Sequence, residues 1–197
     1  MKCIKNTGLD KITDLLIENN IVGFFQGRSE AGPRALGNRS LLMSPMKKEN
    51  KNTMNKFKGR EIFRPLAASV LQSEASKWFD MLGMKKSPHM TFSFECIADK
   101  KKIPSVVHVD GSCRIQTVNK DNKYFYYLIK DFFKKTNIPM LLNTSFNIAG
   151  DPMVESPKDA INTLNKSKLK YIYFPEIKTL LTKWKPQYTL YFQKLFI

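Results

Sequence analysis

The stretch from residue 27 to residue 40, GRSEAGPRALGNRS, constrains this chain more than any other part of it. Two sets of residues alternate in it, the glycines at 27, 32 and 37 and the arginines Arg28, Arg34 and Arg39. Glycine permits positive φ angles and close backbone approach, and a guanidinium offers five donors in a plane that suits phosphate or carboxylate oxygens. Apolar runs at 21–25 and 40–43 flank the stretch. The pattern therefore predicts an anion-binding loop between two strands, with a surface loop of solvated arginines as the alternative.

A second basic cluster follows in the segment KGREIFRPLAASVL, residues 58–71. Lys58, Arg60 and Arg64 stand beside one carboxylate, Glu61, and a strand-like apolar run comes after them. Closely spaced cations repel one another unless water, carboxylates or a bound polyanion compensates. If the two basic clusters converge in space, they imply a multiply charged ligand. The alternative is that Glu61 simply pairs with one of the arginines.

The overall charge agrees with an anionic ligand but does not identify it. The chain has 33 basic and 17 acidic residues, a formal net charge of +16, which would attract nucleotides, nucleic acid or an acidic partner. Many lysines lie in polar runs such as 47–58 and 166–170, which are typical of a solvated surface. A length of 197 residues with 42% apolar residues predicts one globular domain.

Cysteine and histidine usage indicates no metal site and no disulfide framework. The three cysteines show no C-x-x-C spacing, and the two histidines complete no recognisable ligand set. No stretch approaches the roughly 20 apolar residues that a membrane span needs, and the first residues lack an apolar core. We therefore expect a cytoplasmic protein that does not span a membrane.

Helical and strand patterns alternate along the chain. Helices are predicted at 9–20, 47–58, 74–80, 124–135 and 157–166, with Ser73 and Ser156 as N-caps of the third and fifth. Strands are predicted at 21–25, 40–43, 66–71, 91–98, 139–142 and 171–174, and residues 106–118 read as strand, turn and strand around Asp110-Gly111. This alternation predicts an α/β domain with a mixed, twisted open sheet flanked by helices. The polar residues 143–147 end a strand, where ligands commonly bind.

Four segments, GRSEAGPRALGNRS, KGREIFRPLAASVL, HVDGSCRIQTV and LLNTSFNIAGDPMVESPKDA, together resemble the C-terminal domain of the nodulation-protein-U and cephalosporin O-carbamoyltransferase family. The resemblance covers roughly residues 8 to 175, and residues 1–182 would form the domain, with a basic aromatic tail at 183–197. It implies a YrdC-like fold that uses ATP with Mg²⁺ and carbamoyl phosphate to make carbamoyl adenylate. A separate, iron-bearing N-terminal domain would then pass the carbamoyl group to an acceptor hydroxyl.

The resemblance also implies roles for particular residues. Lys58, Arg64 and Arg114 would be catalytic, holding carbamoyl phosphate and stabilising phosphate charge. The substrate-binding residues would be Arg34, Arg60, Asn143 and Ser145, the last two through orienting hydrogen bonds. Fixed cations can hold two anionic substrates together, so this chemistry needs no nucleophilic triad.

The chain departs from the family pattern in a few places. Leu66 and Ala68 stand where phenylalanine and proline are common, and Cys113-Arg114-Ile115 replaces a more usual alanine-arginine-proline. These changes leave the polar groups intact. The iron-bearing half is not among these residues, so a split subunit, a fragment and a domain kept for another task all stay open, and we expect a separately encoded iron-bearing partner.

Two functions of other classes remain as alternatives. The first is an RNA-binding module of the same fold, favoured by the charge of +16. We rank nucleic-acid binding lower because no stripe of aromatics interleaves with the basic residues, as single-strand binders require. The second is a catalytically silent interaction domain. The 183–197 tail is compatible with a closing strand, a partner-binding segment or a poorly ordered end.

Overall fold

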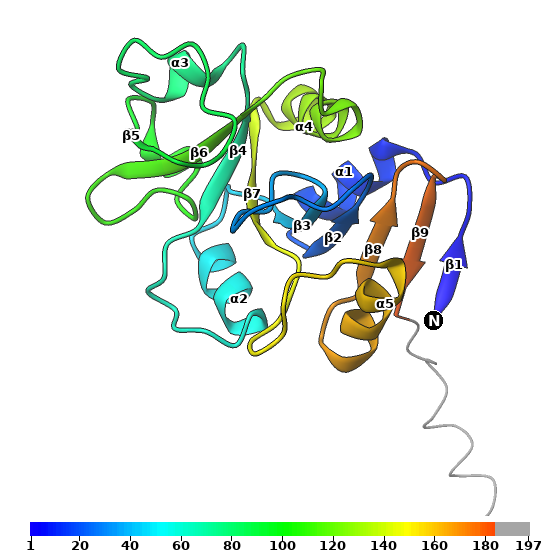
Figure 1. Cartoon of the computed structure of the whole chain (residues 1–197). Coiled ribbons are helices and arrows are strands. Elements are labelled where there is room, and N and C mark those ends of the chain that lie inside the picture. Colours follow the sequence, from blue (N-terminus) through cyan, green and yellow to red (C-terminus); the bar gives the residue numbers. More distant parts are fainter. Residues whose placement is uncertain (184–197) are drawn as a thin grey trace, which may run out of the picture.

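A computed structural model describes residues 1–183, and these form a mixed α/β domain built on one nine-stranded sheet (Figure 1). The strands are β1 (Lys2–Ile4), β2 (Val22–Phe25), β3 (Arg39–Met43), β4 (Ala67–Leu71), β5 (Ser93–Glu95), β6 (Ser112–Val118), β7 (Met140–Ser145), β8 (Tyr171–Phe174) and β9 (Thr179–Thr182). Their order across the sheet is β1-β9-β8-β2-β3-β7-β4-β6-β5. Two neighbouring pairs, β2 with β8 and β4 with β6, are parallel and the others are antiparallel, which confirms the predicted mixed sheet.

The described residues also form five α-helices. They are α1 (Leu9–Ile17), α2 (Glu49–Phe57), α3 (Ala75–Trp78), α4 (Lys123–Thr136) and α5 (Pro157–Lys166), with a short 3₁₀ helix η1 (Lys100–Lys102). The predicted apolar stripe of α4 is buried at Phe125, Leu128, Ile129 and Phe132, and α4 packs on α1, β4 and β7. Residues of β3 and β4 are buried throughout, so both faces of the central sheet are covered.

Helix α5 begins where its local signals predict. The Ser156 hydroxyl accepts a hydrogen bond from the Asp159 amide at 3.3 Å, and the Asp159 carboxylate accepts one from the Ser156 amide at 2.8 Å. With Pro157 at the first helical position, this capping box satisfies donors that a helix start otherwise leaves open. The helix runs to Lys166, as predicted.

Three local predictions were wrong. The first predicted helix ends at residue 17 rather than 20, and α3 has only four residues, with Glu74 rather than Ser73 at its N-cap. Residues 106–109 form turns instead of a strand. Strand β6 is already paired on both sides, with β4 and β5, and the His108 ring contacts the Leu66 carbonyl oxygen at 3.2 Å. This tertiary contact outweighs the β propensity of the valines at 106, 107 and 109.

The edges of the sheet were not predicted. Strands β1 and β9 are short, and their pairing joins the two ends of the described chain through Lys2↔Thr182 and Ile4↔Leu180. Apart from residue 183, the predicted tail at 183–197 lies outside the described residues.

Candidate functional site

Strand β7 carries two of the predicted site residues on one face. Asn143 and Ser145 are two residues apart, so their side chains lie on the same side of the pleat. The Asn143 side chain is buried and its amide donates to the Ala35 carbonyl oxygen at 3.1 Å and to the Ser69 hydroxyl at 2.9 Å. Its oxygen Oδ1 is buried without a hydrogen-bond partner among the described residues. A buried polar atom left in this state indicates a place for a ligand or water.

Lys58 reaches the end of the same strand from the end of α2. Its buried ammonium donates to the Ser145 carbonyl oxygen at 2.7 Å, to the Ser145 hydroxyl at 3.0 Å and to Asn147 Oδ1. Burial, with a further contribution from the nearby Arg60 charge, lowers the pKa of Lys58 to about 7. No carboxylate hydrogen-bonds this lysine, because its partners among the described residues are neutral oxygens. Its charge is therefore available to an anion.

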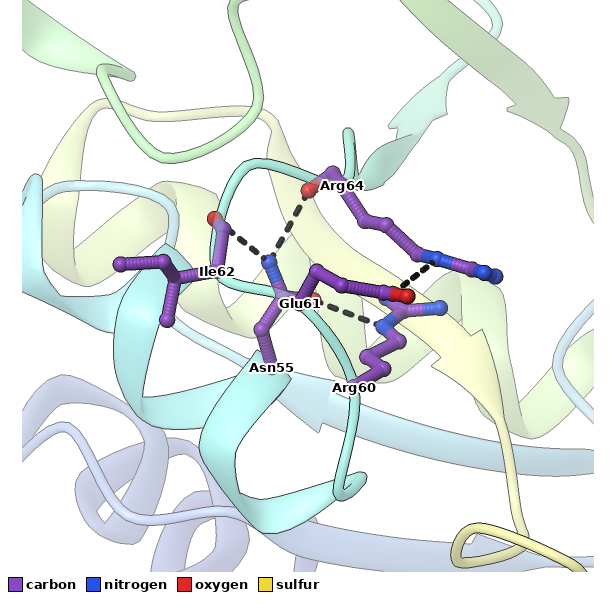
Figure 2. Close-up of polar contacts among 5 residues, drawn as sticks. All are labelled: Asn55, Arg60, Glu61, Ile62 and Arg64. Carbon is purple, nitrogen blue, oxygen red and sulfur yellow. Dashed lines mark hydrogen bonds and ion pairs between the residues drawn. The ribbon is translucent and has the colours of Figure 1, made fainter.

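Asn55 on α2 shapes the turn that follows this helix (Figure 2). Its amide donates to the carbonyl oxygens of Ile62 and Arg64, at 3.1 and 2.9 Å. Its side-chain oxygen accepts a hydrogen bond from Arg60 Nε at 2.7 Å. One buried asparagine thus fixes both the turn and the direction of the Arg60 side chain.

Glu61 pairs with one arginine, which was the alternative interpretation of the second basic cluster. Arg64 Nε lies 2.6 Å from Glu61 Oε2, and Figure 2 shows the pair beside Arg60. Both side chains of the pair are more than half exposed, at 55% and 53%. An exposed pair of this kind contributes little to stability. Arg64 is therefore the least constrained cation of the cluster.

The two basic clusters of the sequence converge on one small cavity. A volume of about 90 Å³ is lined by Arg34 from the glycine-rich loop, Arg60 from the turn after α2, and Arg114 from β6, together with Asn143 and Ser145. We call this the inner cavity. Burial lowers the pKa of Arg114, and the Arg34 charge lowers it further. Arg60 Nη2 and Arg114 Nε are buried and have no hydrogen-bond partner among the described residues. Two guanidinium groups with unused donors fit a small anion.

A wider cavity of about 480 Å³ opens beside the inner cavity and shares Arg60 and Ser145 with it. Its other lining residues include Lys58, Arg64, Asn147 and the 148–150 segment. We call it the outer cavity. The structure thus brings all seven residues of the predicted site to two adjoining cavities.

The three arginines of the glycine-rich loop occupy different surroundings. Arg34 lines the inner cavity and Arg28 is exposed. Arg39 is buried, and it donates to the carbonyl oxygens of Gln26 at 2.6 Å and Gly27 at 3.0 Å, with its guanidinium 3.6 Å from the centre of the Phe25 ring. Arg39 therefore holds the loop together and does not face the cavity.

The glycine-rich loop binds the carboxylate of one of its own residues, Glu30. One carboxylate oxygen of Glu30 accepts hydrogen bonds from the main-chain amides of Leu36 at 2.7 Å, Asn38 at 2.8 Å and Arg39 at 3.4 Å. Gly37, between these residues, has φ +107°, and a Cβ there would lie 2.2 Å from the Phe125 ring. The main-chain amides of this glycine-rich loop thus bind the Glu30 carboxylate and close the loop. The closed loop in turn positions Arg34 and Ala35.

Sequence reasoning missed three residues of the site: Asn55, Asn147 and Glu30. A signal existed for Asn147, which ends the N-T-S-F-N segment and shares Lys58 with Ser145. Asn55 lies in a lysine-rich helix that looks uniformly polar, so only its burial reveals its role. The Glu30 carboxylate is recognisable only once the loop is folded back on itself.

Within residues 1–183, no group of three or more His, Cys, Asp and Glu side chains is placed to hold a metal ion. The three cysteines are free thiols, two of them buried. None of the helices in this described part has the length and apolarity needed to cross a membrane.

The fold defines a class of proteins. The solved structure of full-length HypF in its phosphate- and nucleotide-bound form matches 91% of this chain and 22% of HypF, with a TM-score of 0.57 at 15% identity. The structure of P. abyssi Sua5 complexed with L-threonine matches 83% of this chain and 45% of Sua5, with a TM-score of 0.53 at 12% identity. The domain therefore has the YrdC-like fold, as predicted.

Sequence comparison then gives the family. The carbamoyltransferase C-terminus family model matches residues 13–181, so the chain belongs to this family. Nodulation protein NolO of Bradyrhizobium diazoefficiens is 44% identical over 154 residues, which cover 76% of this chain and 28% of NolO. Nodulation protein U of Sinorhizobium fredii is 38% identical over 144 residues, covering 72% of this chain and 25% of the relative. The chain thus spans about a quarter of the length of these relatives. The family resemblance expected from the four segments is confirmed.

Proposed function

We propose that this carbamoyltransferase domain binds ATP and carbamoyl phosphate and joins them into carbamoyl adenylate. The observation that carries the proposal is the inner cavity, where buried Arg60 and Arg114 present donors with no partner among the described residues. Unpaired buried donors are costly, and an anion that accepts from them recovers that cost. A cavity of about 90 Å³ suits the small substrate, carbamoyl phosphate, and the outer cavity of about 480 Å³ suits phosphates of ATP.

The balanced reaction consumes one water molecule. Water takes the phosphoryl group of carbamoyl phosphate as the bridging P–O bond breaks, which yields phosphate and carbamate. A carbamate oxygen then attacks the α-phosphorus of ATP, and the bond to the β-phosphate breaks to release pyrophosphate. The sum is one carbamoyl adenylate, one pyrophosphate and one phosphate for each pair of substrates, with no oxidant or reductant.

The residues divide this work by position. Arg34, Arg60 and Arg114 hold the phosphate of carbamoyl phosphate in the inner cavity and stabilise the charge that develops on it. Asn143 orients the carbamoyl group, because its unpaired Oδ1 can accept a hydrogen bond from the N–H donors of that group. Arg60 and Asn143 are held by hydrogen bonds before the substrate arrives, so these two groups need little reorganisation during the reaction.

Ser145 lines both cavities, and Lys58, which lines the outer cavity, donates a hydrogen bond to the Ser145 hydroxyl, so we assign both residues to the α-phosphate. Lys58 would neutralise charge as the carbamate approaches. Arg64 is exposed and paired with Glu61. It would leave this pair and contact the β- and γ-phosphates of ATP. Mg²⁺ would come with the ATP phosphates, because the described residues provide no carboxylate set for it.

Transfer of the carbamoyl group to an acceptor hydroxyl is assigned to a separate iron-bearing domain. The relatives are several times longer than this chain, which leaves room for such a domain in them. No step in the present domain passes through iron. Because both substrates are cytoplasmic metabolites, we place the reaction in the cytoplasm.

The test measures pyrophosphate and phosphate released by the purified chain. We expect both products in equal amounts, and pyrophosphate only when ATP, Mg²⁺ and carbamoyl phosphate are all present. Pyrophosphate formed without carbamoyl phosphate, or no binding of ATP, would contradict the proposal. RNA binding that survives replacement of Arg60 and Arg114 by alanine, with a steep dependence on salt, would instead favour the nucleic-acid alternative.

A further inference from the structure

A polar cleft of about 640 Å³ has no described lining residue in common with the inner or the outer cavity. The glycine-rich loop lines the inner cavity with Arg34 and the cleft with Leu36 and Asn38. Strand β6 likewise lines the inner cavity with Arg114 and the cleft with Gln116, two residues further on. The same loop and strand thus border a second space, in which the proposed reaction places no substrate.

Side-chain amides recur in the lining of this cleft, which we call the carboxamide cleft. The amide residues that line it are Gln26, Asn38, Gln72, Gln116, Asn119 and Asn122. A primary amide donates hydrogen bonds through its nitrogen and accepts them through its oxygen. A hydroxyl group also does both, so a set of amides can bond to several neighbouring hydroxyls of one ligand. Tyr124 adds a partly buried aromatic ring, whose apolar face suits the C–H groups of such a ligand.

The charges of the carboxamide cleft are mixed. Glu30, Asp121 and Glu176 line it together with Lys86 and Lys123. The inner cavity differs, because its described lining contains three arginines and no carboxylate. A multiply charged anion in the cleft would lie close to carboxylates of its own sign, which is unfavourable. The mixed charges therefore favour an uncharged ligand over a phosphate.

Several of the amides already hold the glycine-rich loop. Gln26 Nε2 donates to the Gly37 carbonyl oxygen at 2.8 Å and to Asn122 Oδ1 at 2.7 Å. Gln116 and Asn122 donate to the Leu36 carbonyl oxygen at 2.8 and 3.1 Å. A ligand in the cleft would therefore contact the groups that fix this loop.

Two acceptors in the carboxamide cleft remain without a donor among the described residues. Gln26 is only 5% exposed, and its Oε1 accepts none of the hydrogen bonds formed within this part of the chain. Glu30 Oε2 is also buried and unpartnered within residues 1–183. A buried acceptor in this state calls for a donor. Ligand hydroxyls supply such donors, whereas a fully ionised phosphate does not.

We propose that the carboxamide cleft binds a neutral saccharide. Hydroxyls of the sugar would donate to Gln26 Oε1 and Glu30 Oε2. The amides of Gln72 and Asn119, which are less buried, would bond to its other hydroxyls. Tyr124 would pack against the C–H face of the sugar ring. This inference does not depend on the proposed function, because the cleft and the two cavities share no described lining residue.

The experiment titrates the purified chain with glucose, galactose, mannose and fructose, and saturation-transfer NMR follows the binding. Phosphate buffer keeps the cationic cavities occupied. We expect at least one of these sugars to bind with a millimolar dissociation constant or tighter, and its 6-phosphate to bind more weakly. Removing this buffer should leave the affinity for the sugar unchanged.

Two variants of the cleft locate the bound sugar. Gln72→Ala and Asn119→Ala should each weaken the tightest-binding sugar by about two- to tenfold, which corresponds to the loss of one hydrogen bond. Asn162→Ala removes an exposed amide on α5, outside the cleft, and should bind the sugar as the parent does. Circular dichroism checks that all three variants fold.

Four results would overturn the inference. The first is that none of the four sugars binds the parent. The second is competition between phosphate and the sugar, which would place the sugar in the cationic cavities. The third is tighter binding of the 6-phosphate, which would indicate an anion site. The fourth is equal affinity of the parent and both folded cleft variants, which would place the sugar elsewhere.

Discussion

The ammonium of Lys58 donates a hydrogen bond of 2.7 Å to the main-chain carbonyl oxygen of Ser145, across 87 positions of sequence. This contact ties the end of α2 to the end of β7. It also buries a lysine beside neutral acceptors, which lowers the pKa of Lys58 to about 7 from its ordinary 10.5. A lysine with this lowered pKa is largely neutral at pH 8 and can gain a proton when an anion binds.

The burial of Lys58 should make the free energy of unfolding depend on pH. Because burial lowers the folded-state pKa of Lys58, the unfolded chain binds more protons between pH 7 and pH 10.5. The contribution of Lys58 to the free energy of unfolding should therefore be fully present above pH 10.5 and fall as pH decreases toward 7, by about 1.4 kcal/mol per pH unit. Urea unfolding of the parent and of Lys58→Met from pH 6.5 to 9.5 measures this difference. A difference between the two proteins that does not vary with pH would contradict the assignment.

Anion binding should raise the pKa of Lys58 again. A phosphate group in the cavities favours the charged ammonium, so binding at pH 8 should take up a proton. Calorimetry of carbamoyl phosphate binding in buffers of different ionisation enthalpy measures that uptake. We expect close to one proton for the parent and near zero for Lys58→Met. Equal uptake by the two proteins would show that another group titrates.

The arginines should differ in their importance. Arg114 presents an unpaired buried donor, whereas Arg64 is 55% exposed and paired with Glu61. Arg114→Ala should therefore weaken carbamoyl phosphate binding by about 10- to 150-fold, the equivalent of one charge-assisted hydrogen bond worth about 1.5 to 3 kcal/mol. Arg64→Ala should change this affinity by less than about threefold. Circular dichroism checks that both variants fold. The reverse order of effects would refute the assignment of Arg114 to the inner cavity.

The Glu30 carboxylate should control the glycine-rich loop. Removing it in Glu30→Ala leaves the main-chain amides of Leu36 and Asn38 without their acceptor. We expect a loss of about 1 to 3 kcal/mol in the free energy of unfolding and weaker carbamoyl phosphate binding, because the loop positions Arg34. Glu30→Gln keeps one acceptor oxygen and should lose less. If Glu30→Ala matched the parent in both measurements, the loop would be held by other contacts.

The proposed partner domain should dock beside the inner cavity. Ile62 and Phe63 are 51% and 74% exposed, and they precede Pro65 and Leu66, which line this cavity. Carbamoyl adenylate is labile in water, so a covered passage between domains would protect it. Phe63→Ala should leave the stability of the chain unchanged and weaken its association with an iron-bearing partner across an interface of roughly 600 to 1,500 Å². Leu82→Ala, a change at another exposed apolar residue that lines neither cavity, is the control. Equal association of the two variants would exclude this surface.

The sequence by itself determined those features whose signals are local. The capping box of Ser156 and Asp159 and the apolar stripe of α4 depend on neighbours within one or two helical turns, so they were predicted correctly. The mixed α/β architecture followed from the order of these elements. Two basic clusters were also evident, because residue type and spacing are visible in any one sequence.

Only the tertiary structure decided how those side chains are used. Arg34 and Arg39 lie in one glycine-rich loop, yet Arg34 lines the inner cavity while Arg39 bonds to main-chain carbonyls, because the fold of the loop gives each a different direction. Residues 106–109 favour a strand locally but form turns, since β6 already has a partner on each side. The burial of Lys58 depends on Ser145, which is distant in sequence, and only packing could bring them together. Burial and hydrogen bonding across the fold, which no local pattern encodes, set the chemistry of the site.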